Sequence, residues 1–377
     1  MRDLKFFAVT VSLVVAVPTL ADTVGGYVYR DVDGSSRSAY VQEFGSEDAA
    51  MPGVDVALLG FESERTTVTS ASGRFAFADV GDGRYLLDVD VPDTYRATST
   101  NHPRRMMDAV RSGHVKIVAV GDSIGATGSD PYPERLGAIL DTIVETEVVN
   151  LHVGGSASWD WLPGSSRGYF ENRLLPELAD ADLVTITVGG NDLDIYLPPG
   201  GPPYDPLEIF MNFLDNPQYV VEVIPRVVDL VEAIQSANPD CDVLYAVYPN
   251  FANSSYIAPY VGDLADFASW VLDLALRLVR GIVGATDGVL LADMLAAHDG
   301  EWLDDYLIDE VHPSDLGSQV YAEVMFRALG GVTVREGRRA PAELSLFGFD
   351  GDDRDVSKES PRVWRAARPS GVRPNTP

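Results

Sequence analysis

One short run of residues constrains the fold of this chain more than any other. Residues 115–120 read Val-Lys-Ile-Val-Ala-Val, and the turn Gly121-Asp122-Ser123-Ile124-Gly125 follows at once. A β-branched apolar run of this kind is typical of a strand buried in a parallel sheet. The glycine-flanked turn then places the Ser123 hydroxyl at the carboxyl end of that strand, where open α/β sheets hold their ligands.

The residues from 114 to 331 alternate between strand-like and helix-like patterns. Further strands are predicted at residues 147–150, 182–188, 242–247 and 288–291. Helical periodicity separates them, over residues 133–144, 219–237 and 264–283 and after Ser314. Alternation of this kind predicts an α/β domain with a parallel sheet and helices on both faces.

The segment 22–97 has a different pattern, with short alternating strands and turn residues between them. Gly26-x-Val28-Tyr29, Pro52-Gly53-Val54-x-Val56-x-Leu58 and Gly73-Arg74-Phe75-x-Phe77 carry the alternation. Such a pattern predicts a small antiparallel β-sandwich. At these positions the segment resembles the Cna-B-like and B-repeat modules of bacterial surface adhesins. The resemblance implies a fold, and contact with a cell surface or a polysaccharide, but no enzymatic activity.

Two carboxylates after the first predicted strand of the sandwich, Asp31 and Asp33, are weak metal candidates. Some relatives of the module bind calcium in this loop. However, the spacing lacks the later ligands of an EF-hand, so an ordinary Asp-Gly turn is the better interpretation. We therefore expect no required cofactor, and a structural calcium ion in this domain as the alternative.

The remaining segments are predicted to lie outside the two domains. Residues 1–21 combine Arg2 and Lys5 with an apolar run and a small-residue site, which is typical of a cleaved signal peptide and predicts a secreted protein without a transmembrane anchor. Residues 98–113 form a linker with room for one short helix. Residues 332–377 are polar and mixed in charge, and we expect a disordered tail.

Charge and cysteine content exclude several classes of partner. The formal net charge is −29, so nucleic acids and anionic lipid surfaces would repel the chain. The single cysteine, Cys241, excludes an intramolecular disulfide and a cysteine-based metal cluster.

A serine nucleophile requires a base and an orienting acid, and the chain supplies both in one loop. Four polar loops each follow a predicted strand in the larger domain: Gly121-Asp122-Ser123, Gly154-Gly155-Ser156, Gly189-Gly190-Asn191-Asp192 and Asp309-Glu310-Val311-His312. In this order they resemble the four blocks of the SGNH (GDSL-like) hydrolases. That resemblance implies a flavodoxin-like three-layer α/β/α fold and an ester hydrolase.

The resemblance also assigns roles that the chemistry requires. Ser123 would attack an acyl carbonyl, His312 would accept and return its proton, and Asp309 would orient the imidazole. The backbone N–H groups of Ser123 and Gly155 and the side-chain amide of Asn191 would stabilise the oxyanion, with Gly154 as an alternative to Gly155.

Two other interpretations compete with this one. The sequence Gly121-Asp122-Ser123-Ile124-Gly125 also fits the nucleophile elbow of α/β-hydrolases, but here the serine follows the first strand of its domain. The protein could instead be a surface adhesion protein with an inactive hydrolase domain, although every site residue is intact. We expect structural or surface roles for the other histidines, with a substrate contact as the alternative for His152.

An aromatic-rich insert offers candidates for the acyl pocket. Tyr196 lies in a Pro-rich stretch directly after Asn191, and Trp159 follows the Gly155 loop. Both could line the cleft as substrate-binding residues, or could pack the insert onto the domain. The sequence therefore predicts a secreted serine esterase or lipase, and does not choose between a lipid, a small ester and an acylated carbohydrate such as an acetylated polysaccharide.

Overall fold

The computed structural model describes the larger part of the chain, and all described residues belong to the unit Met1–Leu346. The described residues are 8–12, 24–31, 49–61, 63–90, 96–97, 103–192, 212, 222–257, 265–286, 288–298 and 301–334.

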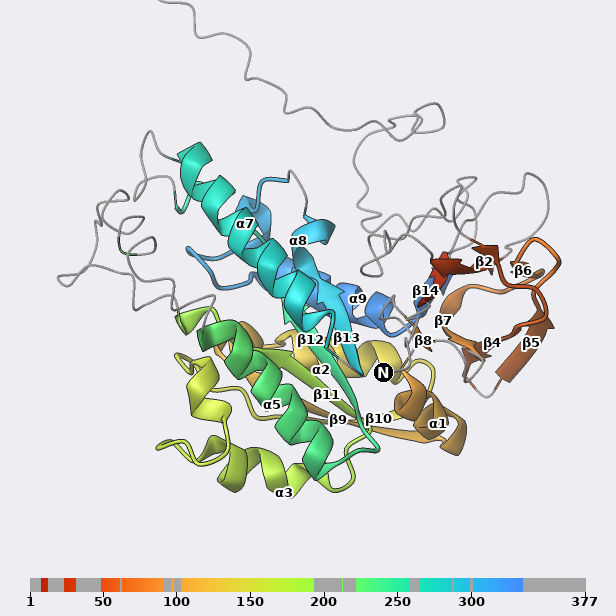
Figure 1. The fold of residues 1–377 in the computed structure, drawn as a ribbon, viewed down its shortest axis with the longest axis horizontal. Helices are drawn as coiled ribbons and strands as arrows, with labels where there is room; N and C mark the ends of the chain where they lie inside the picture. Colours follow the sequence, from red (N-terminus) through yellow and green to blue (C-terminus); the bar gives the residue numbers. More distant parts are fainter. Residues whose placement is uncertain are drawn as a thin grey trace, which may run out of the picture. The chain divides into compact units, whose positions relative to one another are not determined.

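A five-stranded parallel sheet forms the centre of the larger domain (Figure 1). Its strands lie in the order β10 (Glu145–Asn150), β9 (His114–Gly121), β11 (Leu183–Thr187), β12 (Asp242–Val247) and β13 (Val289–Asp293). The apolar run that precedes Ser123 is β9, with every residue after His114 buried. The predicted α/β fold with a parallel sheet is confirmed.

Helices cover both faces of this sheet, as a three-layer α/β/α architecture requires. On one face α5 packs against α3 and α7, and on the other α2 packs against α9. The helices are α1 (Arg104–Ser112), α2 (Tyr132–Leu140), α3 (Leu175–Leu178), α5 (Ile224–Ala237), α7 (Ala265–Val283), α8 (Met294–Ala297) and α9 (Asp315–Ala328). Shorter helical turns are η1 (Ser123–Gly125), η2 (Ser158–Trp161), the π-helical η3 (Phe170–Leu174) and η7 (Asp304–Tyr306).

The helix expected between the two domains is α1, and polar groups hold both of its ends. The Asp242 carboxylate accepts the backbone N–H groups of Arg105 and Met106, which lack partners within the helix. Gly113 ends the helix in the left-handed conformation at φ 93°. Near this end, Arg111 binds the Asp88 carboxylate of the small domain at 2.5 Å. Residues 104–112 of the predicted linker thus form a docked helix.

The small domain is a sandwich of two mainly antiparallel sheets around one core. Val28 and Phe75 from the first sheet and Leu58 and Leu87 from the second are buried in the same cluster. The first sheet contains β3 (Ala49–Ala50), β2 (Val24–Asp31), β1 (Ala8–Ser12) and β8 (Arg96–Ala97), with β6 (Arg74–Phe77) also paired to β2. The second contains β14 (Gly331–Val334), β7 (Gly83–Val89), β4 (Asp55–Gly60) and β5 (Ser63–Val68). The antiparallel strands predicted for this segment are present.

Strand β14 extends the ordered chain beyond the boundary that the sequence suggested. Its residues come after α9, and it pairs with β7 of the small domain, where Val332 lies opposite Tyr85. Val332 and Val334 are buried in the sandwich core, whereas Thr333 between them is half-buried. The expected tail therefore begins no earlier than residue 335, and residues 335–377 lie outside the described part.

Residues 8–12 of the predicted signal peptide form β1, which lies between β2 and β8 in the full chain. Cleavage after Ala21 would remove this strand and leave β2 with its partners β3 and β6. The other residues of the predicted leader, 1–7 and 13–21, lie outside the described residues.

The docking of β14 predicts that its two faces respond differently to charge. Val332→Asp places a carboxylate in the sandwich core and should lower the free energy of unfolding of the full chain by about 2–5 kcal/mol. Thr333→Asp, on the neighbouring residue of the same strand, should change it by less than about 1 kcal/mol. Denaturant unfolding measures both, and equal losses would show that Val332 does not pack into the core.

Candidate active site

The Ser123 turn is held by the side chain of the residue before it. Asp122 is buried, its Oδ1 accepts the backbone N–H of Ile124 at 3.0 Å, and its Oδ2 accepts the Tyr248 hydroxyl at 2.5 Å. Burial raises the pKa of Asp122 to about 6, against the two hydrogen bonds, which favour the charged form. Asp122 thus shapes the turn, and η1 begins at Ser123.

The two glycines that flank the Asp122-Ser123-Ile124 turn make room for His152. A Cβ built on Gly125 would lie 2.3 Å from His152 Nε2, and one built on Gly121 would lie 2.8 Å from the same atom. Gly121 also has a φ of 152°, and its added Cβ would lie 2.2 Å from the Thr187 carbonyl oxygen. These contacts explain why glycine is required at both positions.

His152 is a buried structural residue beneath the turn. Its Nδ1 lies 2.8 Å from Asn150 Oδ1, and its Nε2 lies 3.1 Å from the Tyr132 hydroxyl and 2.9 Å from that of Thr187. Burial lowers the pKa of His152 to about 3, so the ring is neutral and carries its proton on Nδ1, facing the amide oxygen. Because protein groups take both nitrogens, the alternative of a substrate contact receives no support.

The Gly154-Gly155 loop is attached directly to the end of β9. The Val153 N–H and the Ser156 hydroxyl both donate to the Gly121 carbonyl oxygen, each at 2.9 Å. A Cβ built on Gly154 would lie 3.9 Å from Ser123 Cβ, so the loop passes next to Ser123. Gly155 has a left-handed φ of 75° and no atom near its added Cβ. Within the described residues, no protein acceptor takes the N–H of Ser123 or Gly155.

Asn191 and Asp192 hold the Gly154-Gly155 loop through hydrogen bonds to Ser156 and Ser158. Asn191 Nδ2 donates to the Ser156 carbonyl oxygen at 2.9 Å, which leaves its second amide hydrogen for another acceptor. Asp192 is fully buried and accepts the Ser158 N–H at 2.8 Å and the Ser158 hydroxyl at 2.5 Å. Burial raises the pKa of Asp192, while the Ser158 bonds and the nearby Arg226 oppose that rise.

Asp309 and His312 lie together in one closed loop. Asp309 Oδ2 lies 2.7 Å from His312 Nδ1, and Asp309 Oδ1 accepts the His312 N–H at 2.8 Å. An antiparallel bridge between Leu307 and Pro313 closes the loop. Burial acts to raise the pKa of Asp309, but the backbone N–H groups of His312 and Val311 and the imidazole outweigh it, and the pKa lies below its usual value. The carboxylate therefore stays charged opposite the ring.

The four loops converge on the Asp122-Ser123 pair. Gly154 lies beside Ser123 and Gly190 beside the Asp122 carboxylate, and the charge of His312 acts to lower the pKa of Asp122. No hydrogen bond joins the Ser123 hydroxyl to His312 within the described residues. A serine hydroxyl, a carboxylate–imidazole pair and three N–H donors that no described acceptor takes lie at one sheet edge, and such a set of groups suits acyl transfer.

The other candidates of the sequence analysis have different environments. Trp159 is 39% exposed, and the Arg226 guanidinium lies 5.3 Å from its ring centroid. Tyr196 and Asp33 lie outside the described residues, and Asp31 is the last residue of β2. Among the described residues, no three His, Cys, Asp or Glu side chains form a metal-binding group.

The sequence analysis did not single out Tyr248, and it placed Asp192 in a polar loop without giving it a role. Tyr248 comes directly after β12 and its hydroxyl reaches across the sheet edge to Asp122. Asp192 follows the recognised Asn191. A polar residue at the carboxyl end of a predicted strand was the available signal for both.

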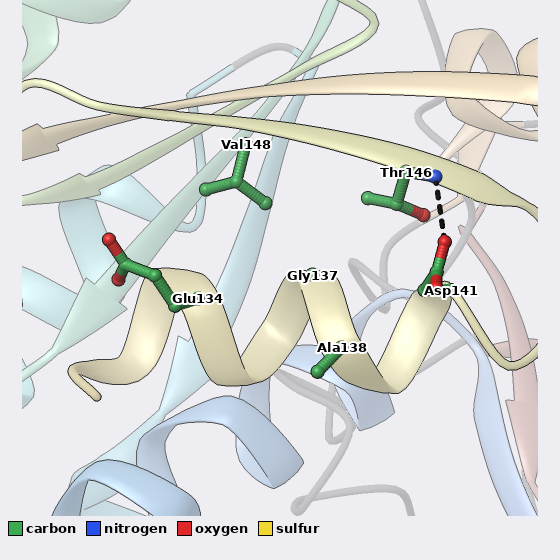
Figure 2. A pocket seen from close by; sticks show the side chains of 6 residues that line it. All are labelled: Glu134, Gly137, Ala138, Asp141, Thr146 and Val148. Atoms are coloured by element: carbon green, nitrogen blue, oxygen red, sulfur yellow. Dashed lines mark hydrogen bonds between the residues drawn. The ribbon is translucent and has the colours of Figure 1, made fainter.

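A shallow pocket away from these residues lies between α2 and the edge strand β10 (Figure 2). It is lined by Glu134, Gly137, Ala138, Asp141, Thr146 and Val148. Asp141 Oδ1 accepts the Thr146 N–H at 3.2 Å at one end of it, as the dashed line in Figure 2 shows. None of the site residues lines this pocket, so it has no part in the proposed chemistry.

Comparison with known proteins identifies the class to which the fold and the loops belong. Residues 119–320 match the GDSL-like Lipase/Acylhydrolase family, so the chain is a member of that family. No curated protein matches the chain. None of the described helices is long and apolar enough to cross a membrane.

Solved structures similar to this chain are esterases and lipases of low sequence identity. The acetylxylan esterase Axe2 from Geobacillus stearothermophilus is 20% identical, with a TM-score of 0.43, over 59% of this chain and 97% of that chain. The extracellular lipase from Streptomyces rimosus is also 20% identical, with a TM-score of 0.43, over 57% and 99%. The lipase Lip_vut3 from a goat rumen metagenome is 19% identical, with a TM-score of 0.42, over 57% and 98%.

The buried Asp122 carboxylate predicts a defined pH dependence of stability. Because its pKa is raised from 3.8 in the unfolded chain to about 6, folding is favoured by protonation, and this contribution is lost as pH rises from about 4 to 6. Asp122→Asn keeps an acceptor for the Ile124 N–H without this titration. Relative to the wild type, the variant should therefore gain stability between pH 4 and pH 7, by on the order of 2–3 kcal/mol. Denaturant unfolding across that range measures the gain, and a pH-independent difference would contradict it.

Proposed function

We propose that this protein is a secreted serine ester hydrolase that cleaves acyl esters through Ser123, His312 and Asp309. Its family membership supports an ester hydrolase in general terms. The observation that carries the finer assignment is the 2.7 Å hydrogen bond between Asp309 and His312 in the loop that faces the nucleophile turn. No metal or cofactor is required for this chemistry.

The mechanism follows from the roles of Asp309, His312 and Ser123 as orienting acid, base and nucleophile. Asp309 accepts the Nδ1 proton of His312, which leaves Nε2 free to act as a base. The Ser123 hydroxyl transfers its proton to Nε2 while its oxygen bonds to the ester carbonyl carbon. The tetrahedral intermediate expels the alcohol, which takes the proton from His312. Water then releases the acid from the acyl-enzyme by the same two steps.

The developing oxyanion needs donors that are already in place. The N–H groups of Ser123 and Gly155 have no protein acceptor among the described residues, and the Asn191 amide has one hydrogen left after its bond to Ser156. Donors held by other bonds cost little reorganisation when charge develops, which is the main source of this kind of stabilisation. Gly154 lies nearer to Ser123 and is the alternative to Gly155.

The missing Ser123–His312 hydrogen bond is compatible with this mechanism. Catalytic hydrogen bonds are often long without substrate and tighten in the Michaelis complex. A non-enzymatic surface protein is the alternative function, and it predicts no turnover of any ester. Hydrolysis of p-nitrophenyl esters from acetate to palmitate, with acetylated xylan alongside, separates the two and distinguishes a lipid esterase from a carbohydrate acetyl esterase.

We also propose that the protein is secreted and that its small domain contacts a cell surface or a polysaccharide. The signal peptide pattern of residues 1–21 supports secretion, and the likeness of residues 22–97 to Cna-B modules supports a surface or polysaccharide contact. The net charge of −29 argues against nucleic acid as a partner. Binding of residues 22–97 to polysaccharide would have to be measured in the full chain, because β14 completes the second sheet.

Substitution of the triad should separate activity from stability. Ser123→Ala and His312→Ala should each lower kcat/KM by at least about a thousandfold with little change in melting temperature, because both side chains are partly exposed. Asp309→Ala should lose less, since water can partly orient the imidazole. The controls are Ser129→Ala and His114→Ala, both exposed and outside the site. A Ser123 variant that keeps a tenth of the wild-type rate would remove Ser123 from the mechanism.

Metal removal should leave the chemistry intact. Treatment with EDTA should not change initial rates on p-nitrophenyl acetate, because the proposed mechanism uses only protein groups. If Asp31 and Asp33 bind a structural calcium ion, the same treatment lowers the melting temperature and calcium restores it. Loss of activity that zinc restores would contradict the serine mechanism.

A further inference from the structure

Helix α7 has an exposed apolar face along most of its length. Trp270 is 59% exposed, Leu274 47%, Leu278 40% and Ile282 43%, and each follows the previous one by four residues. Residues with this spacing lie above one another on a helix. Phe267, 37% exposed, stacks on Trp270 at the beginning of the same face. We call the four residues from Trp270 to Ile282 the α7 stripe.

The α7 stripe is not the face that holds the helix in the fold. Leu276, Val279 and Val283 are buried on the opposite side, and Arg280 there binds the buried Asp293 of β13. A helix that uses one apolar face for its core normally has charged residues on the other. Among the described residues, such a large second apolar face is a feature of α7 that packing within the chain does not explain.

The beginning of α7 is attached to the catalytic edge of the sheet. Asn250, in the loop that follows β12, donates to the backbone oxygen and the hydroxyl of Ser269, and Ser269 donates to Asn253. The Asn253 carbonyl oxygen in turn accepts the Leu303 N–H at 2.8 Å. The loop after β12 therefore connects the first turns of α7 to the segment that leads to His312.

That segment carries exposed apolar side chains of its own. Trp302 is 57% exposed, and its Nε1 donates to Asp304, which also accepts the Ser255 N–H. Ile308 and Val311, on either side of Asp309, are 56% and 38% exposed. Apolar groups thus occur both along α7 and beside the acid and the base, on two elements joined through one loop.

The exposed area and the charge of the protein indicate which kind of partner binds the α7 stripe. The α7 stripe presents on the order of 350 Å² of side chain, below the roughly 800 Å² that each partner buries in a stable dimer. A second copy would also bring a further charge of −29, and an anionic membrane would repel the chain. Beside the stripe, Asp273 and Arg277 form an ion pair whose two charges cancel. We propose that the α7 stripe docks the protein on an electrically neutral lipid surface, with Trp270 inserted among the head groups.

This proposal is tested by vesicle flotation of the full chain carrying Ser123→Ala. Binding is then measured without ester cleavage, so its outcome is separate from that of the proposed function. The chain should float with phosphatidylcholine vesicles, and the double variant Trp270→Ser, Leu278→Ser should partition at least about tenfold less. The matched control is Phe61→Ser, which removes a 63% exposed ring of the small domain and should leave binding unchanged.

Two further measurements keep the test independent of how the double variant folds. Brominated phosphatidylcholine should quench tryptophan emission of the Ser123→Ala chain, and Trp270→Phe should reduce that quenching while retaining binding. Sedimentation equilibrium should give a monomer. The proposal is overturned if the chain does not float, if the double variant binds as tightly, or if the chain is a dimer that the double variant dissociates. It also fails if phosphatidylglycerol vesicles bind more tightly at low salt.

Discussion

The buried carboxylate of Asp122 is the interaction on which the rest of the site depends. A chain that leaves a parallel strand and presents a side chain at the sheet edge has to turn sharply, and here one carboxylate closes the turn by accepting the Ile124 N–H and the Tyr248 hydroxyl. A buried charge is tolerated only when its oxygens have partners. The turn and the loop after β12 are therefore held together by the need to satisfy Asp122.

The neighbouring loops are positioned by the same principle, with polar groups satisfied by backbone atoms. Ser156 and Val153 bind the Gly154-Gly155 loop to Gly121, and Asp192 binds the following residues through Ser158. Every one of these bonds uses a group other than the N–H donors proposed for the oxyanion. The network thus fixes the donors without occupying them, which is the arrangement that electrostatic stabilisation of a transition state requires. His152 supports the turn from below as a neutral ring.

The sequence predicted those features that depend on local patterns. The run before Ser123 became β9, the helix after Ser314 became α9, and the antiparallel strands of the small domain lie where alternation indicated. What it missed are partners distant in the chain. The alternation at Val332 and Val334 is too short to predict a strand, and these residues form one because β7 lies beside them. Tyr248 reaches Asp122 because β12 and β9 belong to the same sheet. Trp159 is placed at a half-exposed position against Arg226, whereas Tyr196 lies outside the described residues.

The most direct test of the central claim, that Ser123 is an activated nucleophile, is covalent labelling with a fluorophosphonate followed by peptide mass spectrometry. The reagent bonds to a serine only when a base removes the hydroxyl proton. The account predicts one labelled site, Ser123, with labelling abolished by Ser123→Ala and strongly slowed by His312→Ala. Labelling of another serine, or labelling of Ser123 at the same rate without His312, would contradict it.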